Sequence, residues 1–215
     1  MIVKQISKNI YLIKFKTRYD LTSTLLRFQE HYESPKFKGK IFTLEEYKRW
    51  YIKNSPKGIK TGKFTYYKDW SGFNIPSHIL QPFYRGLFNP LTEAEKSILH
   101  VFNKIRNKKF YIIGVYGDVD KSILKHEIAH GMYYSNNDYN KEVNAVLKKM
   151  DQIAVKQIIK YFKKNAGYHK DVYLDEIHAY TLTEKGLLKK RGVDVHRILN
   201  TRKDLIALFK KYSSR

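Results

Sequence analysis

Residues 108–134, KKFYIIGVYGDVDKSILKHEIAHGMYY, combine two patterns that together favour one kind of fold. The first part, 108–118, is rich in β-branched and aromatic residues, which predicts a strand. The second part has the periodicity of a helix and contains the pattern H-E-x-x-H at His126, Glu127 and His130. The sequence therefore predicts a strand that leads directly into a helix carrying two histidines and a glutamate.

The spacing of the two histidines is what a metal site on a helix requires. Residues four apart lie on one face of a helix, one turn apart, so both imidazoles can reach the same ion. Zinc binds such nitrogens at about 2.0–2.1 Å. A glutamate beside the first histidine then faces the open position of the metal, where it can take a proton from zinc-bound water. We expect His126 and His130 to be zinc ligands and Glu127 to be the general base.

The residues around this pattern carry a resemblance to a known superfamily. Ile128 and Ala129 lie between the histidines, Gly131 and Met132 follow them, and all four are uncharged. This stretch resembles the zinc-binding helix of the zincin metallopeptidases, and the preceding strand matches their order of elements. The resemblance implies a zincin-like fold, a Zn²⁺ cofactor and hydrolysis of peptide bonds.

The branches of that superfamily differ in their third protein ligand. One branch continues as H-E-x-x-H-x-x-G-x-x-H, but here Tyr133 and Asn136 stand where it has glycine and histidine. The gluzincin branch instead takes a glutamate from a later helix. In YLDEIHAYT (173–181), Glu176 is followed three residues later by the small Ala179. The resemblance to gluzincins therefore implies Glu176 as the third ligand.

Other third ligands stay open. Glu142 in KEVNAVL (141–147) is also followed three residues later by alanine, but it comes soon after His130 and lies at the edge of an apolar stripe. Asp175 and His178 are further alternatives. Asp175 is also suited to accept a hydrogen bond from a ligand histidine, a contact that fixes the tautomer of the ring.

A peptidase also needs a hydrogen-bond donor for the oxyanion that develops on the attacked carbonyl. Tyrosine and histidine are the usual donors in the enzymes that this helix resembles. We favour Tyr180 and His169 for this role. Tyr168, Tyr133 and Tyr134 are alternatives, and the 18 tyrosines of the chain leave the choice among them open.

The remaining patterns predict an α+β fold with a small N-terminal β/α region and a mostly helical C-terminal half. Two short strands are expected in the first sixteen residues. The strand at 110–116, before the H-E-x-x-H helix, is expected to be an edge strand that borders the cleft, so that an extended substrate could pair with it. The other expected elements are helices at 20–33, 43–54, 90–107 and 171–186, one or two helices within 139–164, a C-terminal helix capped by Thr201, and loops at 55–77 around a short strand at Phe64–Tyr67. We expect a single zincin-like domain over 1–215, with lobes at 1–90 and 91–215 as an alternative division.

Composition narrows the class of protein. The chain is 42% hydrophobic with 15% aromatic residues, which is enough for a packed core, and it has no cysteine for a thiolate zinc site. We expect a soluble, cytoplasmic protein, because the sequence has neither an apolar run of membrane-spanning length nor the pattern of a signal peptide. Its partner would be a protein or peptide substrate.

The net charge of +22 has two interpretations. Lys far outnumbers Arg, and Ile, Asn, Tyr and Phe are abundant, which is the composition that an AT-rich genome produces. The alternative is a basic protein associated with nucleic acid, in which the H-E-x-x-H pattern is inert or structural. A third hypothesis is a degenerate zincin that binds zinc and acts only as a binding module.

Overall fold

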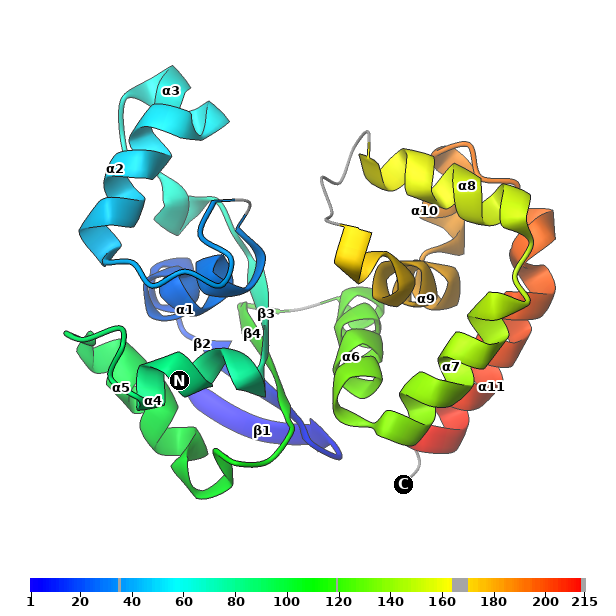
Figure 1. The fold of residues 1–215 in the computed structure, drawn as a ribbon, viewed down its shortest axis with the longest axis horizontal. Coiled ribbons are helices and arrows are strands. Elements are labelled where there is room, and N and C mark those ends of the chain that lie inside the picture. Colours follow the sequence, from blue (N-terminus) through cyan, green and yellow to red (C-terminus); the bar gives the residue numbers. More distant parts are fainter. Residues whose placement is uncertain (35, 119, 164–169, 214–215) are drawn as a thin grey trace. The chain divides into compact units, whose positions relative to one another are not determined.

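The computed structural model describes residues 1–34, 36–118, 120–163 and 170–213, which form an α+β fold of helices and a four-stranded sheet. The chain divides into two compact units, Met1–Ile6 with Tyr11–Val119 and Ser7–Ile10 with Asp120–Arg215 (Figure 1). This division differs from a boundary at residue 90. The helix and strand between residues 90 and 118 belong to the first unit, because the helix packs on the N-terminal helix and the strand pairs within the sheet.

The first unit contains the strands and the N-terminal helices. Its elements are β1 (Ile2–Ser7), β2 (Ile10–Phe15), α1 (Arg18–Glu33), α2 (Leu44–Asn54), α3 (Pro56–Thr61), η1 (Tyr66–Lys68), β3 (Gly72–Pro76), η2 (Ser77–Leu80), α4 (Gln81–Tyr84), α5 (Glu93–Phe102), η3 (Asn103–Ile105) and β4 (Tyr111–Tyr116). The predicted strand pair at the N-terminus, the helices at 20–33, 43–54 and 90–107 and the strand at 108–118 are confirmed to within a few residues. Thr43 and Thr92 begin α2 and α5 with capping boxes, as the sequence predicts.

The position of β4 in the sheet corrects one prediction. The strand order is β1-β2-β4-β3, so β4 is an inner strand and the expectation of an edge strand before the H-E-x-x-H helix is wrong. β3 pairs antiparallel with β4, with Gly72 opposite Val115 and Ile75 opposite Ile112. Residues 111–115 are all buried, the pattern of a strand covered on both faces. Among the described strands, β1 and β3 form the edges of the sheet.

The segment 55–77 was predicted to be mostly loops, but it contains the short helix α3. The capping residues at its start favour a helix despite the glycine and proline content of the segment. Ser55 accepts a hydrogen bond from the Gly58 amide, and Pro56 occupies the first turn, so α3 begins there. The predicted strand at Phe64–Tyr67 is wrong. Its aromatic residues instead form a buried aromatic cluster around η1, and the strand of this region is β3.

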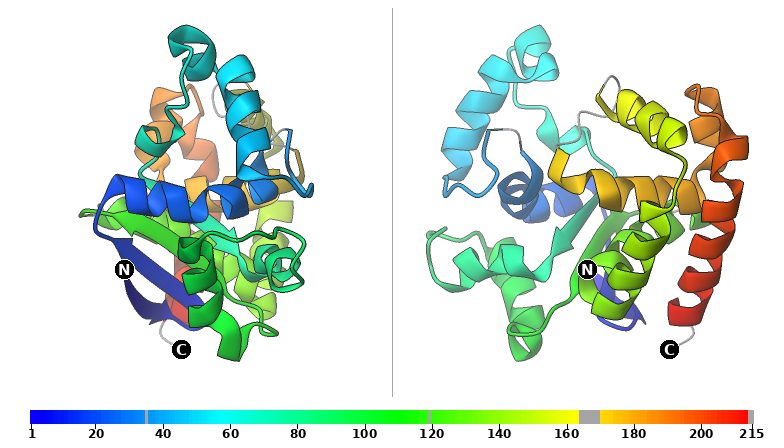
Figure 2. Two further views of the ribbon diagram at one scale, coloured as in Figure 1. Left: turned by 90° about the vertical axis from the view of Figure 1, so that its left-hand side faces the viewer. Right: turned by 45° about the vertical axis from the view of Figure 1, so that its right-hand side comes forward.

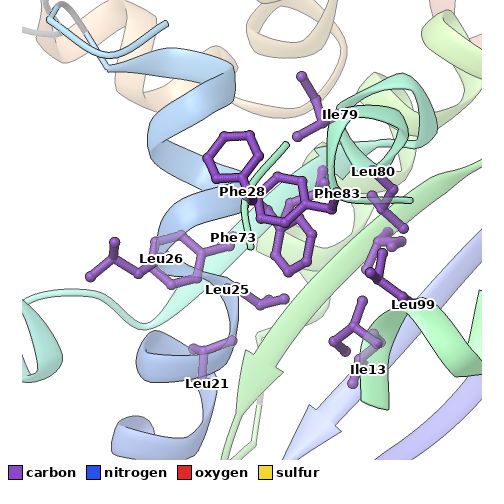
Figure 3. Packing of buried hydrophobic residues seen from close by; sticks show 14 of the residues in the cluster. Ile13, Leu21, Leu25, Leu26, Phe28, Phe73, Ile79, Leu80, Phe83 and Leu99 are labelled. Carbon is purple, nitrogen blue, oxygen red and sulfur yellow. The ribbon is translucent and has the colours of Figure 1, made fainter. Parts of the chain in front are cut away.

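The core of the first unit lies between α1 and the sheet (Figure 3). Leu21, Leu25 and Phe28 on α1 are fully buried. A Cβ atom on Gly114 of β4 would lie 2.4 Å from the Leu25 Cδ1 atom and 3.1 Å from the Leu21 Cδ1 atom. Glycine at this position therefore allows α1 to approach the sheet as closely as it does.

Apart from Ser7–Ile10, which joins β1 to β2, the second unit is helical in its described part. Its elements are α6 (Lys121–Ser135), α7 (Asn137–Lys148), α8 (Gln152–Tyr161), η5 (Lys170–Val172), α9 (Tyr173–Thr183), α10 (Lys185–Lys190), η6 (Val195–Ile198) and α11 (Leu199–Ser213). α6 packs against α9, and α7 lies beside α11 (Figure 2).

Two predictions for this unit are settled by helix ends. The described part of this segment, residues 139–163, is divided between α7 and α8, and Asp151 caps α8 by accepting from the Ile153 and Ala154 amides. The cap predicted at Thr201 is wrong, because α11 begins at Leu199 and Thr201 is buried within it.

Among the described residues, no helix combines the length and the apolar character needed to cross a membrane.

Candidate metal centre

The H-E-x-x-H residues lie on α6, which begins where the sequence provides a cap. The Ser122 amide donates to the Asp120 carboxylate at 2.6 Å, so the first turn is capped. His126 and His130 follow on one face of the helix. Their ring centroids are 4.8 Å apart and their Nε2 atoms are 3.1 Å apart. The helix therefore brings two imidazole nitrogens to the same point.

The third residue comes from α9, which packs against α6. Asp175 and Glu176 lie in the first turn of α9, where the positive end of the helix dipole favours carboxylates. Ala129 and Ala179 have no exposed surface, and such small side chains let two helices pack closely. The Glu176 Oε2 atom lies 3.7 Å from the His130 Nε2 atom.

The three groups could hold a metal ion. One ligand atom from each of His126, His130 and Glu176 lies within 4.8 Å of both others. Two nitrogens bound to a tetrahedral zinc ion are about 3.3 Å apart, given zinc–nitrogen distances of about 2.0–2.1 Å. The 3.1 Å separation of the two Nε2 atoms is close to that value. Two imidazoles and one carboxylate are also the ligand types that zinc accepts in catalytic sites.

The other nitrogen of each histidine faces an acceptor oxygen on α9. The His130 Nδ1 atom lies 2.9 Å from the Asp175 Oδ1 atom, which is the contact that suits Asp175 as an acceptor for a ligand histidine. The His126 Nδ1 atom lies 3.0 Å from the Thr183 hydroxyl, which donates to the Ala179 carbonyl at 2.8 Å. Since a carboxylate only accepts and this hydroxyl proton is already used, both Nδ1 atoms are donors.

This arrangement leaves the two Nε2 atoms facing each other with their lone pairs. Such a pair at 3.1 Å is stable only with a positive charge between the nitrogens, either a proton or a metal ion. Burial opposes charge on His130, but Asp175, Glu176 and Glu127 raise its pKa to about 10. Burial and the neighbouring His130 lower the pKa of His126 to about 3. The geometry therefore favours a cation at this point.

Asp175 is charged at neutral pH. Burial would raise the pKa of its carboxyl group, but the charge and hydrogen bond of His130, together with the contact of His178, hold that pKa below its ordinary value. An ionised carboxylate behind a metal-ligating imidazole raises the basicity of the ring.

The two remaining predicted site residues that the structure describes also lie in this region. Glu127 is half-buried on α6, and its charge helps to raise the pKa of His130. The Tyr180 ring packs edge-on against the His126 ring, with centroids 5.0 Å apart. Tyr180 therefore touches the site, while its role as an oxyanion donor stays a prediction.

Among the described residues, the other candidates from the sequence are outside the metal-binding group. Glu142 accepts from Lys211 and Tyr212 of α11, at 2.7 Å and 2.6 Å, and is not part of the metal-binding group. The Tyr133 hydroxyl donates to Asn144 at 2.7 Å. His169 and Tyr168 lie outside the described residues, and Tyr134 is half-buried on α6.

Sequence reasoning missed the role of Thr183. It lies seven residues after Glu176, which is two turns along the same face of α9, so helical spacing could have identified it. It also missed His178 as a buried partner of Tyr139, whose hydroxyl lies 2.8 Å from the His178 Nε2 atom. No signal in the sequence connects those two residues.

No protein-family model matches this chain, and neither a curated protein nor a solved structure is significantly similar to it.

Proposed function

We propose that this protein is a zinc-dependent metallopeptidase of gluzincin type. The observation that supports this most strongly is the convergence of His126, His130 and Glu176, from two packed helices, on one point. The orienting contacts of Asp175 and Thr183 favour the same proposal, because metal-ligating histidines almost always donate their other ring nitrogen to such a group. A zincin-like fold is part of the proposal.

Different residues of the chain would have different roles in this reaction. His126, His130 and Glu176 would hold the ion, which when bound supplies Lewis acidity and lowers the pKa of a water molecule. Glu127 then accepts a proton from the attacking water and passes it to the leaving amine. The effect of the Glu127 charge on the pKa of His130 supports this role, because it places the carboxylate near the site.

Metal content tests the first part of the proposal. We would measure zinc by mass spectrometry in the untagged wild type, Glu176→Ala and Glu142→Ala, all prepared identically. We expect about one zinc per chain in the wild type and in Glu142→Ala, and a large loss only in Glu176→Ala. Glu142 is a matched control, because it is a glutamate of the same unit bound to Lys211 instead. A wild type that holds no zinc after zinc loading and dialysis would contradict the proposal.

Activity tests the second part. We expect the zinc-loaded wild type to cleave members of a mixed library of quenched fluorescent peptides. Glu127→Gln should keep its zinc but lose about 10²–10⁴-fold in rate, because it keeps the shape of the side chain without the base. Equal rates in the two proteins would remove Glu127 from the mechanism. A zinc-loaded wild type without hydrolysis would instead favour a binding module.

A further inference from the structure

His178 is a buried histidine that the proposed reaction does not use. It lies on α9, one turn after Asp175, and has no exposed surface. Its Nε2 atom is 2.8 Å from the Tyr139 hydroxyl of α7. Its Nδ1 atom is 3.7 Å from the Asp175 Oδ1 atom. The ring therefore lies between a tyrosine hydroxyl and the carboxylate that orients His130.

The chemistry of the carboxylate fixes the direction of these contacts. The same Asp175 Oδ1 atom faces His130 Nδ1 at 2.9 Å and His178 Nδ1 at 3.7 Å. An ionised carboxylate offers only acceptor positions, so the favourable His178 tautomer carries its proton on Nδ1. Its Nε2 atom is then an acceptor, and the Tyr139 hydroxyl donates to it. Because 3.7 Å exceeds hydrogen-bond length, the His178 contact with Asp175 is electrostatic.

The His178 ring is also held in its orientation by aromatic neighbours. The Tyr133 ring of α6 stacks on it, with centroids 5.4 Å apart and planes 24° apart. The Tyr139 ring meets it edge-on, with centroids 5.5 Å apart. Tyr139 is itself anchored, because its amide donates to the Asn136 side chain that caps α7. Three helices therefore fix the position of this imidazole.

We propose that Tyr139 and His178 are positioning residues for the metal centre. The Tyr139 hydroxyl selects the tautomer of His178. His178 in turn directs its Nδ1–H toward the Asp175 Oδ1 atom at 3.7 Å, and this electrostatic contact keeps that carboxylate aligned with His130. The inference rests on the proposed function, since it requires a metal ion at the candidate site. A purely structural histidine would instead affect the stability of the unit and leave the metal site unchanged.

The test compares two variants that each remove one tyrosine hydroxyl. Tyr139→Phe removes the hydroxyl that bonds to His178 and keeps the ring. Tyr133→Phe is the matched control, because its ring also contacts His178 but its hydroxyl donates to Asn144. In the full chain, we would measure zinc affinity by competition with a chromophoric chelator and record the visible absorption of the cobalt-substituted protein. Thermal unfolding would establish that each variant is folded.

We expect Tyr139→Phe to weaken zinc binding about tenfold and to shift the cobalt spectrum, with neither change in Tyr133→Phe. A second pair keeps the test independent of Tyr139. His178→Asn retains a donor near the Nδ1 position, and His178→Leu does not, so the leucine variant should bind zinc more weakly than the asparagine variant.

The outcomes separate this inference from the proposed function. Wild-type protein that binds neither zinc nor cobalt overturns both. If the wild type binds zinc, and Tyr139→Phe and His178→Leu bind it equally well with unchanged cobalt spectra, only the positioning role is overturned.

Discussion

At the scale of single residues, the Thr183 hydroxyl determines which ring nitrogen of His126 is free to bind a metal ion. It accepts from the His126 Nδ1 atom and so directs the Nε2 lone pair toward the candidate metal position. We expect Thr183→Val, which keeps the shape but removes the acceptor, to weaken zinc binding about tenfold. Competition with a chelator measures the change. Thr183→Ser retains the hydroxyl and should bind like the wild type, so equal affinities for the two variants would refute this role.

Arg27 and Glu95 form a buried ion pair in the first unit. Both side chains are at most 5% exposed, and Arg27 also donates to the Phe88 carbonyl at 2.9 Å. Arg27→Met leaves the Glu95 charge buried without its partner, so the free energy of unfolding should fall by about 3–5 kcal/mol. Urea denaturation measures this loss. The double variant Arg27→Met/Glu95→Gln should recover part of it, because glutamine removes the charge and preserves the capping box of α5. A double variant less stable than the single one would contradict this explanation.

The ligand residues were easier to predict than the groups that hold them. His126 and His130 are evident because a helix converts a spacing of four into proximity. Glu176 followed from a resemblance and Asp175 from its place beside it. Helical spacing places Thr183 on the same face of α9 as Glu176. Its contact with the His126 Nδ1 atom, however, forms only when α9 packs on α6, and local spacing does not specify that packing.

At the scale of elements, the approach of α1 to the sheet depends on Gly114 of β4. A methyl group there would meet the Leu25 side chain at 2.4 Å in a fully buried position. We expect Gly114→Ala to lower the free energy of unfolding by about 1–3 kcal/mol through overpacking. Denaturant unfolding measures the loss. Gly62→Ala would be a poor control because of its positive φ, whereas Gly186→Ala meets no neighbouring atom and should change stability little. An unchanged free energy of unfolding in Gly114→Ala would show that the Leu25 side chain moves aside freely.

Helix ends were predicted where capping residues are explicit, and the sheet was predicted only in part. Thr43 and Thr92 predicted the starts of α2 and α5, because each forms a capping box with a glutamate three residues later. β3 was missed, since its five residues lie in a segment rich in glycine and proline. Without β3, nothing in the sequence indicated that β4 has a partner on that side.

At the scale of the whole molecule, the candidate ligands all belong to the second unit. Binding to the native state suppresses opening of the segments that hold the ligand. We therefore expect saturating zinc to slow amide hydrogen exchange more in α6 and α9 than in α1 and β4. Mass spectrometry of peptide fragments measures the difference, with Glu176→Ala as the control. Equal slowing in both units would mean that they open together, and no slowing in α6 and α9 would argue against zinc at this site.

The overall class was predictable, and the division into units was not. A helical C-terminal half and a small sheet followed from periodicity, which reports local structure. The division near residue 119 depends on α5 packing against α1 and on β4 pairing with β3. These are contacts between distant parts of the chain, and the spacing of residues does not specify them.

The helix α9 contributes Glu176, and it also carries the acceptors of both histidine Nδ1 atoms. The metal affinity of this protein would consequently depend on the equilibrium between docked and undocked α9. If α9 is docked only part of the time, the apparent dissociation constant rises in inverse proportion to the docked fraction. Substitutions remote from the ligands that loosen this helix would then lower zinc affinity by the same factor by which they depopulate the docked state. A metal titration would thereby serve as a gauge of helix docking.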